Sequence, residues 1–180
     1  MNVFILDHSL ALSAQYHVDR HVVKMPTEAL QICSSALYLS RPNDYEAYKV
    51  LCTKPTHLNH PMVKWAAESM EAFAYVAEYG LAVAYEYTFR YSRTHATHTR
   101  LKFMREAVAN KYSPNMLSAP LCIPEKYKLK TTAQIDNYRN YYLHGKNHIH
   151  RWTTRDIPYW IFTSRNGVSP TVGIGWHPIH

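Results

Sequence analysis

The sequence of 180 residues is poor in glycine and cysteine and lacks several catalytic motifs. Its five glycines form neither a GxGxxG nor a GxxxxGK pattern, which argues against a Rossmann-type dinucleotide site and a phosphate-cradling P-loop. No GxSxG motif supports a serine hydrolase. The three cysteines include no CxxC pair and suggest no disulfide framework, so a reducing compartment is expected.

Segments that would direct the chain to or through a membrane are also missing. No apolar run approaches about 20 residues, so we expect no transmembrane span. The N-terminus shows no basic region followed by an apolar block and a small-residue cleavage site, so we expect no secretory signal. Both observations favour a cytoplasmic location without a membrane partner.

The charge is divided unevenly along this basic chain, whose formal net charge is +7. Residues 1–92 carry seven basic and nine acidic side chains, whereas residues 93–180 carry thirteen basic and four acidic ones. A basic C-terminal half indicates a surface for a polyanion, although a basic protein without a nucleic-acid partner is the alternative. Fifteen tyrosines suit base stacking, a tyrosine-rich core, or both.

Hydrophobic periodicity predicts a mostly α-helical protein, a single compact domain over residues 1–180 with four main helices and irregular connections. An apolar run at residues 2–6 is expected to form a short strand or an extended arm packed on the core. Pro26 should kink or break the first helix just before it, because proline removes a backbone donor and clashes with the preceding turn. The four helices are expected at residues 11–39, 61–91, 97–110 and 131–152. The connection at 40–55 is expected to be polar with some helical character, and the connection at 113–124 is expected to be irregular.

The segment from His17 to Glu28 contains the leading candidate site. If it is helical, apolar residues form one continuous face, and His17, His21, Lys24 and Glu28 form a second line along its rim. Two imidazoles, an amine and a carboxylate in that position can perturb one another's pKa values, which acid–base or nucleophilic chemistry needs. A helix with a solvated polar edge is the alternative interpretation.

Two further clusters favour phosphate binding. His57 and His60 precede the helix expected at residue 61, where backbone N–H groups attract anions. Arg90, Arg93 and His95 alternate with aromatic residues, a mixture suited to holding a phosphate and a base together. Cations that stabilise a helix C-terminus are the alternative for the second cluster.

Histidine pairs at helical spacing, such as His17 with His21, raise the possibility of zinc binding. No HExxH motif occurs, however, and no carboxylate completes a standard ligand set. A lysine within the first group also argues against a bound cation. We therefore expect neither a metal nor another cofactor.

Three segments, Gln15–Pro26, His60–Glu86 and Tyr138–Trp160, carry a resemblance to known proteins. The chain resembles a family of phage and large-DNA-virus proteins and, more remotely, the pyrimidine-dimer DNA glycosylases of the phage endonuclease V type. In that comparison the segments are similar to the first helix, the central helix and a C-terminal Arg-Pro-x-Trp-Tyr region. The resemblance implies a small α-helical DNA-repair enzyme that flips out a nucleotide, cuts the N-glycosidic bond through a Schiff base and nicks the strand.

Two positions differ from that family's pattern. The family uses the α-amine of a threonine exposed by loss of the initiator methionine, whereas here position 2 is Asn2, after which Met1 is usually kept. Lys24 occupies the neighbourhood of the family's catalytic first-helix glutamate. A partly buried lysine beside His21 can lose its proton and attack C1′ of a sugar, which makes Lys24 a candidate nucleophile.

We therefore predict a DNA-acting base-excision enzyme of viral type, an N-glycosylase with or without AP-lyase activity, in the host cytoplasm if the chain is viral. Lys24 would be the nucleophile or an electrostatic anchor, and Glu28 would act as acid or base. His17 and His21 would tune their pKa values. The predicted nucleic-acid contacts are Arg20, His57, His60, Arg90, Arg93, His95, Arg139, Arg151 and Arg155.

Two other functions fit the same residues. One is a non-catalytic protein that sequesters a nucleotide or signalling molecule, and the other is a nucleotide hydrolase or transferase that acts on a small molecule. Salt dependence separates them from the first prediction, because a DNA-tracking enzyme loses affinity steeply with added salt.

Overall fold

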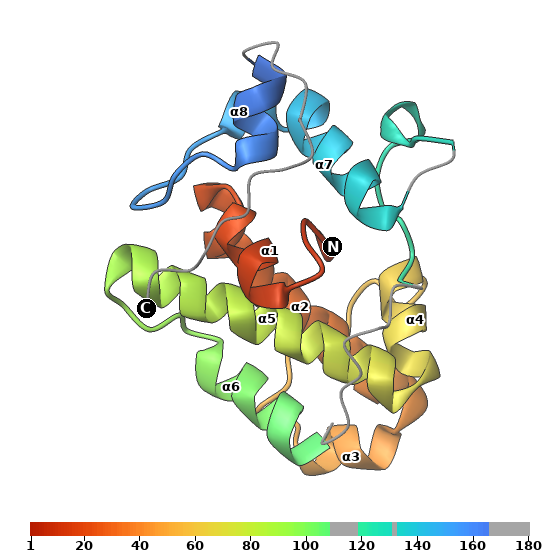
Figure 1. The fold of residues 1–180 in the computed structure, drawn as a ribbon. Coiled ribbons are helices and arrows are strands. Elements are labelled where there is room, and N and C mark those ends of the chain that lie inside the picture. Colours follow the sequence, from red (N-terminus) through yellow and green to blue (C-terminus); the bar gives the residue numbers. More distant parts are fainter. Residues whose placement is uncertain (109–118, 131–132, 166–180) are drawn as a thin grey trace.

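Helices make up all the regular secondary structure in the described part of the chain (Figure 1). The structure, a computed structural model, describes residues 1–108, 119–130 and 133–165. The α-helices are α1 Leu10–Tyr16, α2 Asp19–Ser40, α3 Pro42–Ala47, α4 Pro61–Glu68, α5 Met70–Tyr91, α6 His98–Phe103, α7 Gln134–Gly145 and α8 Tyr159–Arg165. Shorter helical turns lie at Met104–Val108, Glu125–Tyr127 and Asn147–Ile149. The predicted mostly α fold is confirmed.

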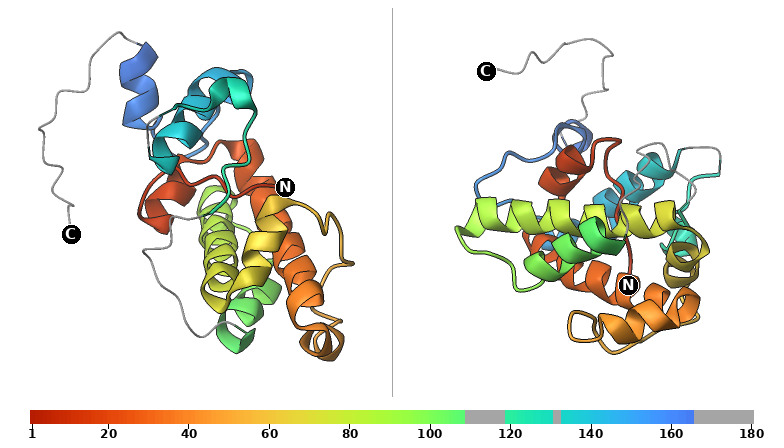
Figure 2. Two further views of the ribbon diagram at one scale, coloured as in Figure 1. Left: turned by 90° about the vertical axis from the view of Figure 1, so that its right-hand side faces the viewer. Right: turned by 90° about the horizontal axis from the view of Figure 1, so that it is seen from below.

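The two longest helices, α2 and α5, pack against each other at the centre of the fold. They lie so close at Gly80 that an added Cβ would lie 2.5 Å from Cβ of Ala29. Helices α3 and α6 lie on one side of this pair, and α1, α7 and α8 lie on the other (Figures 1 and 2). The first residues of the chain lie between the central pair and α7, and they bond to both.

The N-terminal residues form an extended arm rather than a strand. Phe4 and its apolar neighbours in the arm are buried. The backbone of the arm bonds to side chains: the Phe4 N–H donates to the Tyr79 hydroxyl (3.3 Å) and the Leu6 N–H to the Ser13 hydroxyl (3.0 Å). Buried backbone groups need such partners, so these contacts fix the path of the arm.

The first predicted helix breaks at a different place from the one expected. Pro26 lies inside α2, and the break falls at His17 and Val18, whose backbone is extended. There the His17 Nδ1 contacts the Ser13 carbonyl at the end of α1 (2.6 Å), and the Asp19 N–H donates to the Arg151 carbonyl (2.9 Å). A local contact of His17 and a tertiary bond of Asp19, rather than proline, therefore mark where this helix breaks.

The other helix predictions are corrected in their boundaries. The helix expected at 61–91 is split by Ser69, whose extended backbone ends α4 and whose hydroxyl accepts from the Ala72 N–H at the start of α5. The third becomes α6 followed by a π-helical turn, and the last is shorter than predicted. Helix α8 was not predicted at all. Residues 109–118, 131–132 and the tail from 166 lie outside the described part.

Close packing at Gly80 leads to a stability prediction. Alanine forms helix better than glycine by about 1 kcal/mol, but forcing a methyl group into a filled space costs about 1–3 kcal/mol. Because the new Cβ would lie 2.5 Å from Ala29 and 3.0 Å from Leu101, overpacking should outweigh propensity in Gly80→Ala. We expect a lower free energy of unfolding in urea. The double variant A29G/G80A should lose less unfolding free energy than the two single variants lose together. Additive losses would contradict this packing.

Candidate active site

A nearly buried carboxylate, Glu28, is surrounded by three nitrogen groups, two of which belong to the start of the chain. Its side chain is only 9% exposed, and its Oε1 lies 2.7 Å from the Lys24 ammonium. The Asn2 N–H donates to Oε2 at 3.0 Å, and the α-amine of Met1 lies 4.0 Å from the same oxygen. A buried carboxylate is costly unless it is paired, so the chain terminus and Lys24 act as its counter-charges.

The side chain of Asn2 attaches the terminus to the C-terminal half of the chain. Its Nδ2 donates to the Cys122 carbonyl (2.8 Å), and its Oδ1 accepts from the Tyr138 hydroxyl (3.0 Å) and from the Val3 N–H (2.8 Å). Sequence reasoning missed this role and treated Asn2 only as a departure from a family pattern. The predicted burial of residues 2–6 was the available signal, because a buried arm places the terminus inside the protein.

Helix α4 brings a histidine to the same place. His60 caps this helix, and its Nδ1 accepts from the Met62 N–H (3.2 Å). Burial lowers the pKa of His60, and the positive charges of the Met1 α-amine and His57 lower it further. His57 is exposed and bonds to the neighbouring Thr56 hydroxyl. His60 lies far from the His17–Glu28 segment along the sequence. In the fold it lies near enough to Glu28 and the Met1 α-amine for their charges to affect its pKa.

The two histidines of the predicted rim lie instead in an aromatic core. His17 Nε2 contacts the Tyr79 hydroxyl (2.8 Å), and His21 Nδ1 contacts the Tyr142 hydroxyl (2.5 Å) while its ring stacks on Phe4. Burial lowers the pKa of His17 to about 4 and that of His21 to about 2, the latter helped by the charges of His17, Lys146 and Lys24. The expectation that both histidines lie on the polar rim with Lys24 and Glu28 is therefore wrong. They are neutral at physiological pH and hold the arm in place.

Lys24 is more exposed than the sequence suggested. A partly buried amine was expected, but 68% of its side chain is accessible. Its ammonium reaches forward one helical turn to Glu28. The carboxylate that faces the terminus is thus Glu28, while Lys24 closes the site from the solvent side.

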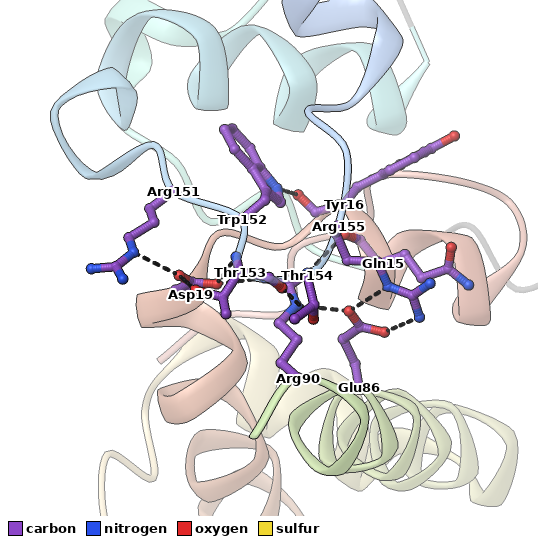
Figure 3. A network of polar contacts seen from close by, with 10 residues as sticks. All are labelled: Gln15, Tyr16, Asp19, Glu86, Arg90, Arg151, Trp152, Thr153, Thr154 and Arg155. Atoms are coloured by element: carbon purple, nitrogen blue, oxygen red, sulfur yellow. Dashed lines mark hydrogen bonds and ion pairs between the residues drawn. The ribbon is translucent and has the colours of Figure 1, made fainter. Parts of the chain in front are cut away.

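Several predicted phosphate-binding arginines are already engaged inside the protein. Arg90 is buried, with its guanidinium 2.9 Å from Asp19 and 2.7 Å from Glu86 (Figure 3). Arg155 binds the same Glu86 carboxylate with two nitrogens, at 2.9 and 2.8 Å, and stacks on Phe89. The expectation that Arg90 contacts a phosphate is therefore wrong, since its charge is neutralised and shielded from solvent.

Two other predicted contacts are also committed to internal partners. Arg139 donates to the Leu6 carbonyl (2.8 Å) and pairs with Asp7 (3.0 Å). His95 lies beneath the surface and contacts the Val23 carbonyl and the Thr97 hydroxyl. Both hold α2 or the arm in position, so neither offers a free group to a phosphate.

The remaining predicted contacts are exposed. Arg20 and Arg93 face solvent, and Arg151 does so while its Nε lies 3.4 Å from Asp19. Arg20 and Arg151, with His148 and Tyr91, line a cavity of about 420 Å³ at the N-terminal end of α2. Arg20 and Lys24 are one turn apart on the exposed side of that helix. A basic strip therefore extends from this cavity to Glu28.

Within residues 1–108, 119–130 and 133–165, no group of three or more histidine, cysteine, aspartate or glutamate side chains is placed to hold a metal ion. No helix in those ranges is long and apolar enough to cross a membrane.

The sequence model of a family described as pyrimidine dimer DNA glycosylase matches residues 1–99. The chain belongs to this family. Membership makes it a DNA glycosylase by class, with DNA as the class of substrate, and confirms the resemblance seen in the sequence. The match contains the arm, Glu28, Lys24 and His60, but it ends before Cys122 and Tyr138. No curated protein and no solved structure matches the chain.

The buried histidines predict acid sensitivity of the fold. The pKa of His17 is about 4 in the folded state and 6.5 as a free side chain, so below pH 6.5 the unfolded chain binds a proton that the folded chain does not. Stability should fall as the pH decreases from 6.5 to 4, with His17 contributing about 3 kcal/mol. Urea unfolding at several pH values should show a flatter profile for His17→Gln. The exposed His8 provides the control: H8Q should keep the wild-type profile, and equal slopes for H17Q would contradict the assignment.

Proposed function

We propose that this family member excises damaged bases from duplex DNA as a glycosylase of the viral type. The reaction would pass through a covalent amine–sugar intermediate that forms beside Glu28, and strand cleavage would follow. The observation that carries the proposal is the convergence of a nearly buried carboxylate with the chain's α-amine and with Lys24. A free amine is the nucleophile that Schiff-base chemistry requires, and an adjacent carboxylate can take its proton. The family description supports a pyrimidine dimer as the lesion.

In the proposed reaction, the unprotonated amine attacks C1′ of the damaged nucleotide. The C1′–N bond breaks, and its electron pair leaves with the base, which takes up a proton. The ionised Glu28 carboxylate stabilises the oxocarbenium-like sugar as the C1′–N bond breaks, and it then accepts the proton that the attacking nitrogen loses. Opening of the C1′–O4′ bond, with a proton delivered to O4′, gives the imine. Loss of a C2′ proton from the imine then expels the 3′ phosphate and cuts the strand.

Two primary amines flank Glu28, and we favour the α-amine as the nucleophile. The α-amine belongs to a residue whose side chain is only 4% exposed, and it faces Glu28 from within the protein, whereas the Lys24 side chain is 68% exposed. Lys24 is exposed and paired, which suits the alternative role of an electrostatic anchor for DNA. If Met1 is removed, the Asn2 nitrogen becomes the amine, and it already lies 3.0 Å from Glu28.

DNA would lie along the exposed side of α2. Arg20 and Lys24 would contact successive phosphates, and Arg151 would contact a further phosphate at the basic cavity. Arg93 and the exposed His57 would extend this surface. The placement leaves the lesion beside Glu28, where a nucleotide turned out of the duplex would meet the amine.

The first test concerns the carboxylate. Glu28→Gln keeps the shape of the side chain and removes its charge, so borohydride trapping on a duplex with one pyrimidine dimer should fall about 10²–10⁴-fold. DNA affinity should change by no more than a few-fold. The adduct formed by the wild-type protein should map by mass spectrometry to the N-terminal peptide, and K24A should still form it.

Each alternative has its own outcome in that experiment. An adduct on Lys24 would overturn the assignment of the α-amine and favour the nucleophile suggested by the sequence. The absence of both an adduct and strand cleavage across a panel of lesions would refute the Schiff-base mechanism. Undiminished trapping by E28Q would remove Glu28 from the reaction.

The second test concerns the DNA surface. Removal of one side chain that binds a phosphate should reduce the slope of log K against log salt by about 1, so R20A/R151A should reduce it by about 2. Lys49→Ala, which changes an exposed lysine just after α3, is the matched control and should leave the slope unchanged. Binding that barely responds to salt in the wild-type protein would favour a small-molecule pocket over DNA.

A further inference from the structure

The N-terminal site is completed by residues that lie beyond the matched part of the chain. The family match ends at residue 99, yet two of the groups that hold Asn2 come from later segments. Cys122 supplies a backbone carbonyl from the segment before α7, and Tyr138 supplies a hydroxyl from α7 itself. The C-terminal half thus contacts the residue that follows the terminal amine.

The carboxamide of Asn2 has little freedom in this environment. Its oxygen accepts two hydrogen bonds, its nitrogen donates one, and the residue is only 7% exposed. Tyr138 is fully buried, so solvent does not compete for its hydroxyl, which lies 3.0 Å from Asn2 Oδ1 and 3.4 Å from the Pro120 carbonyl. With the side chain fixed at three points, the backbone nitrogen of Asn2 is held against Glu28.

The chemistry of an amide suits this position better than that of other side chains. It presents a donor to the Cys122 carbonyl and an acceptor to the Tyr138 hydroxyl at the same time. An aspartate would lack the donor and would place a second negative charge near Glu28. A leucine of similar size would leave the buried hydroxyl and carbonyl without this partner, which is costly.

We propose that Asn2 and Tyr138 are positioning residues that set the distance between the terminal amine and Glu28, which makes α7 part of the catalytic apparatus. This inference rests on the proposed function, because it treats that amine as the nucleophile. Placement errors of about 1 Å can cost about 10²-fold in rate. Loss of this bridge should therefore slow the reaction without weakening DNA binding.

The test compares single-turnover trapping at saturating dimer-containing DNA for Y138F, N2L and the double variant. Y138F removes one hydroxyl and should lower the trapping rate about 10–100-fold, with the dissociation constant for DNA within twofold of wild type. Because both substitutions break one bridge, the double variant should be no slower than the slower single variant. Tyr141→Phe, on the same helix, is the control and should react at the wild-type rate. Mass spectrometry of the intact proteins must show that all variants begin at the same residue.

A second measurement does not depend on DNA. Reductive methylation of the folded protein with formaldehyde should label the α-amine faster in Y138F than in wild type or Y141F, because the terminus is less well held. Wild-type trapping rates in Y138F, or additive effects of the two substitutions, would overturn the proposal. If the wild-type protein traps no DNA, the proposed function fails, and the methylation rates alone decide whether Tyr138 positions the terminus: unchanged labelling in Y138F would then overturn it.

Discussion

The pairing of Glu28 with the start of the chain is the interaction on which the rest of the structure depends. A carboxylate in the middle of the central helix α2 is taken out of water on the face where α2 meets the arm. Desolvation of that charge is costly unless a positive group and hydrogen-bond donors come with it. Lys24 satisfies one oxygen from the solvent side, and the terminal residues satisfy the other from within. The carboxylate therefore requires that the terminus be buried.

Burial of the terminus explains the unusual polar content of the aromatic core. An extended arm without a neighbouring strand needs side-chain partners for its backbone, and the Tyr79 and Ser13 hydroxyls provide them. His17 in turn contacts Tyr79, and His21 stacks on Phe4. The two imidazoles stay neutral because burial lowers the pKa of both, and neighbouring positive charges lower that of His21 further. The His17–Glu28 segment, which the sequence predicts to be catalytic, is thus divided between the proposed reaction site and the support of the arm.

The sequence predicted well what depends on local pattern and poorly what depends on distant partners. Helical periodicity identified α2 and α5, and the types of residue in the His17–Glu28 segment pointed to Glu28. The break at His17 was missed because it depends on a bond from the Asp19 N–H to the distant Arg151 carbonyl, which leaves no periodic signal. Asn2 was judged by identity alone, since its partners Cys122 and Tyr138 lie more than a hundred residues away.

The uneven charge of the two halves has a structural consequence within the fold. Acidic residues of the first half bind arginines of the second: Glu86 binds Arg155, Asp7 binds Arg139, and Asp19 lies beside Arg151. Burial alone would raise the pKa of Asp19, but hydrogen bonds from Thr153 and Arg90 more than offset it and lower that pKa, which keeps this link charged at neutral pH. Part of the basic charge that suggested a polyanion surface therefore attaches the C-terminal half to the N-terminal half. Because that attachment places Tyr138 against Asn2, the same charges that reduce the free DNA-binding surface complete the site at which DNA would react.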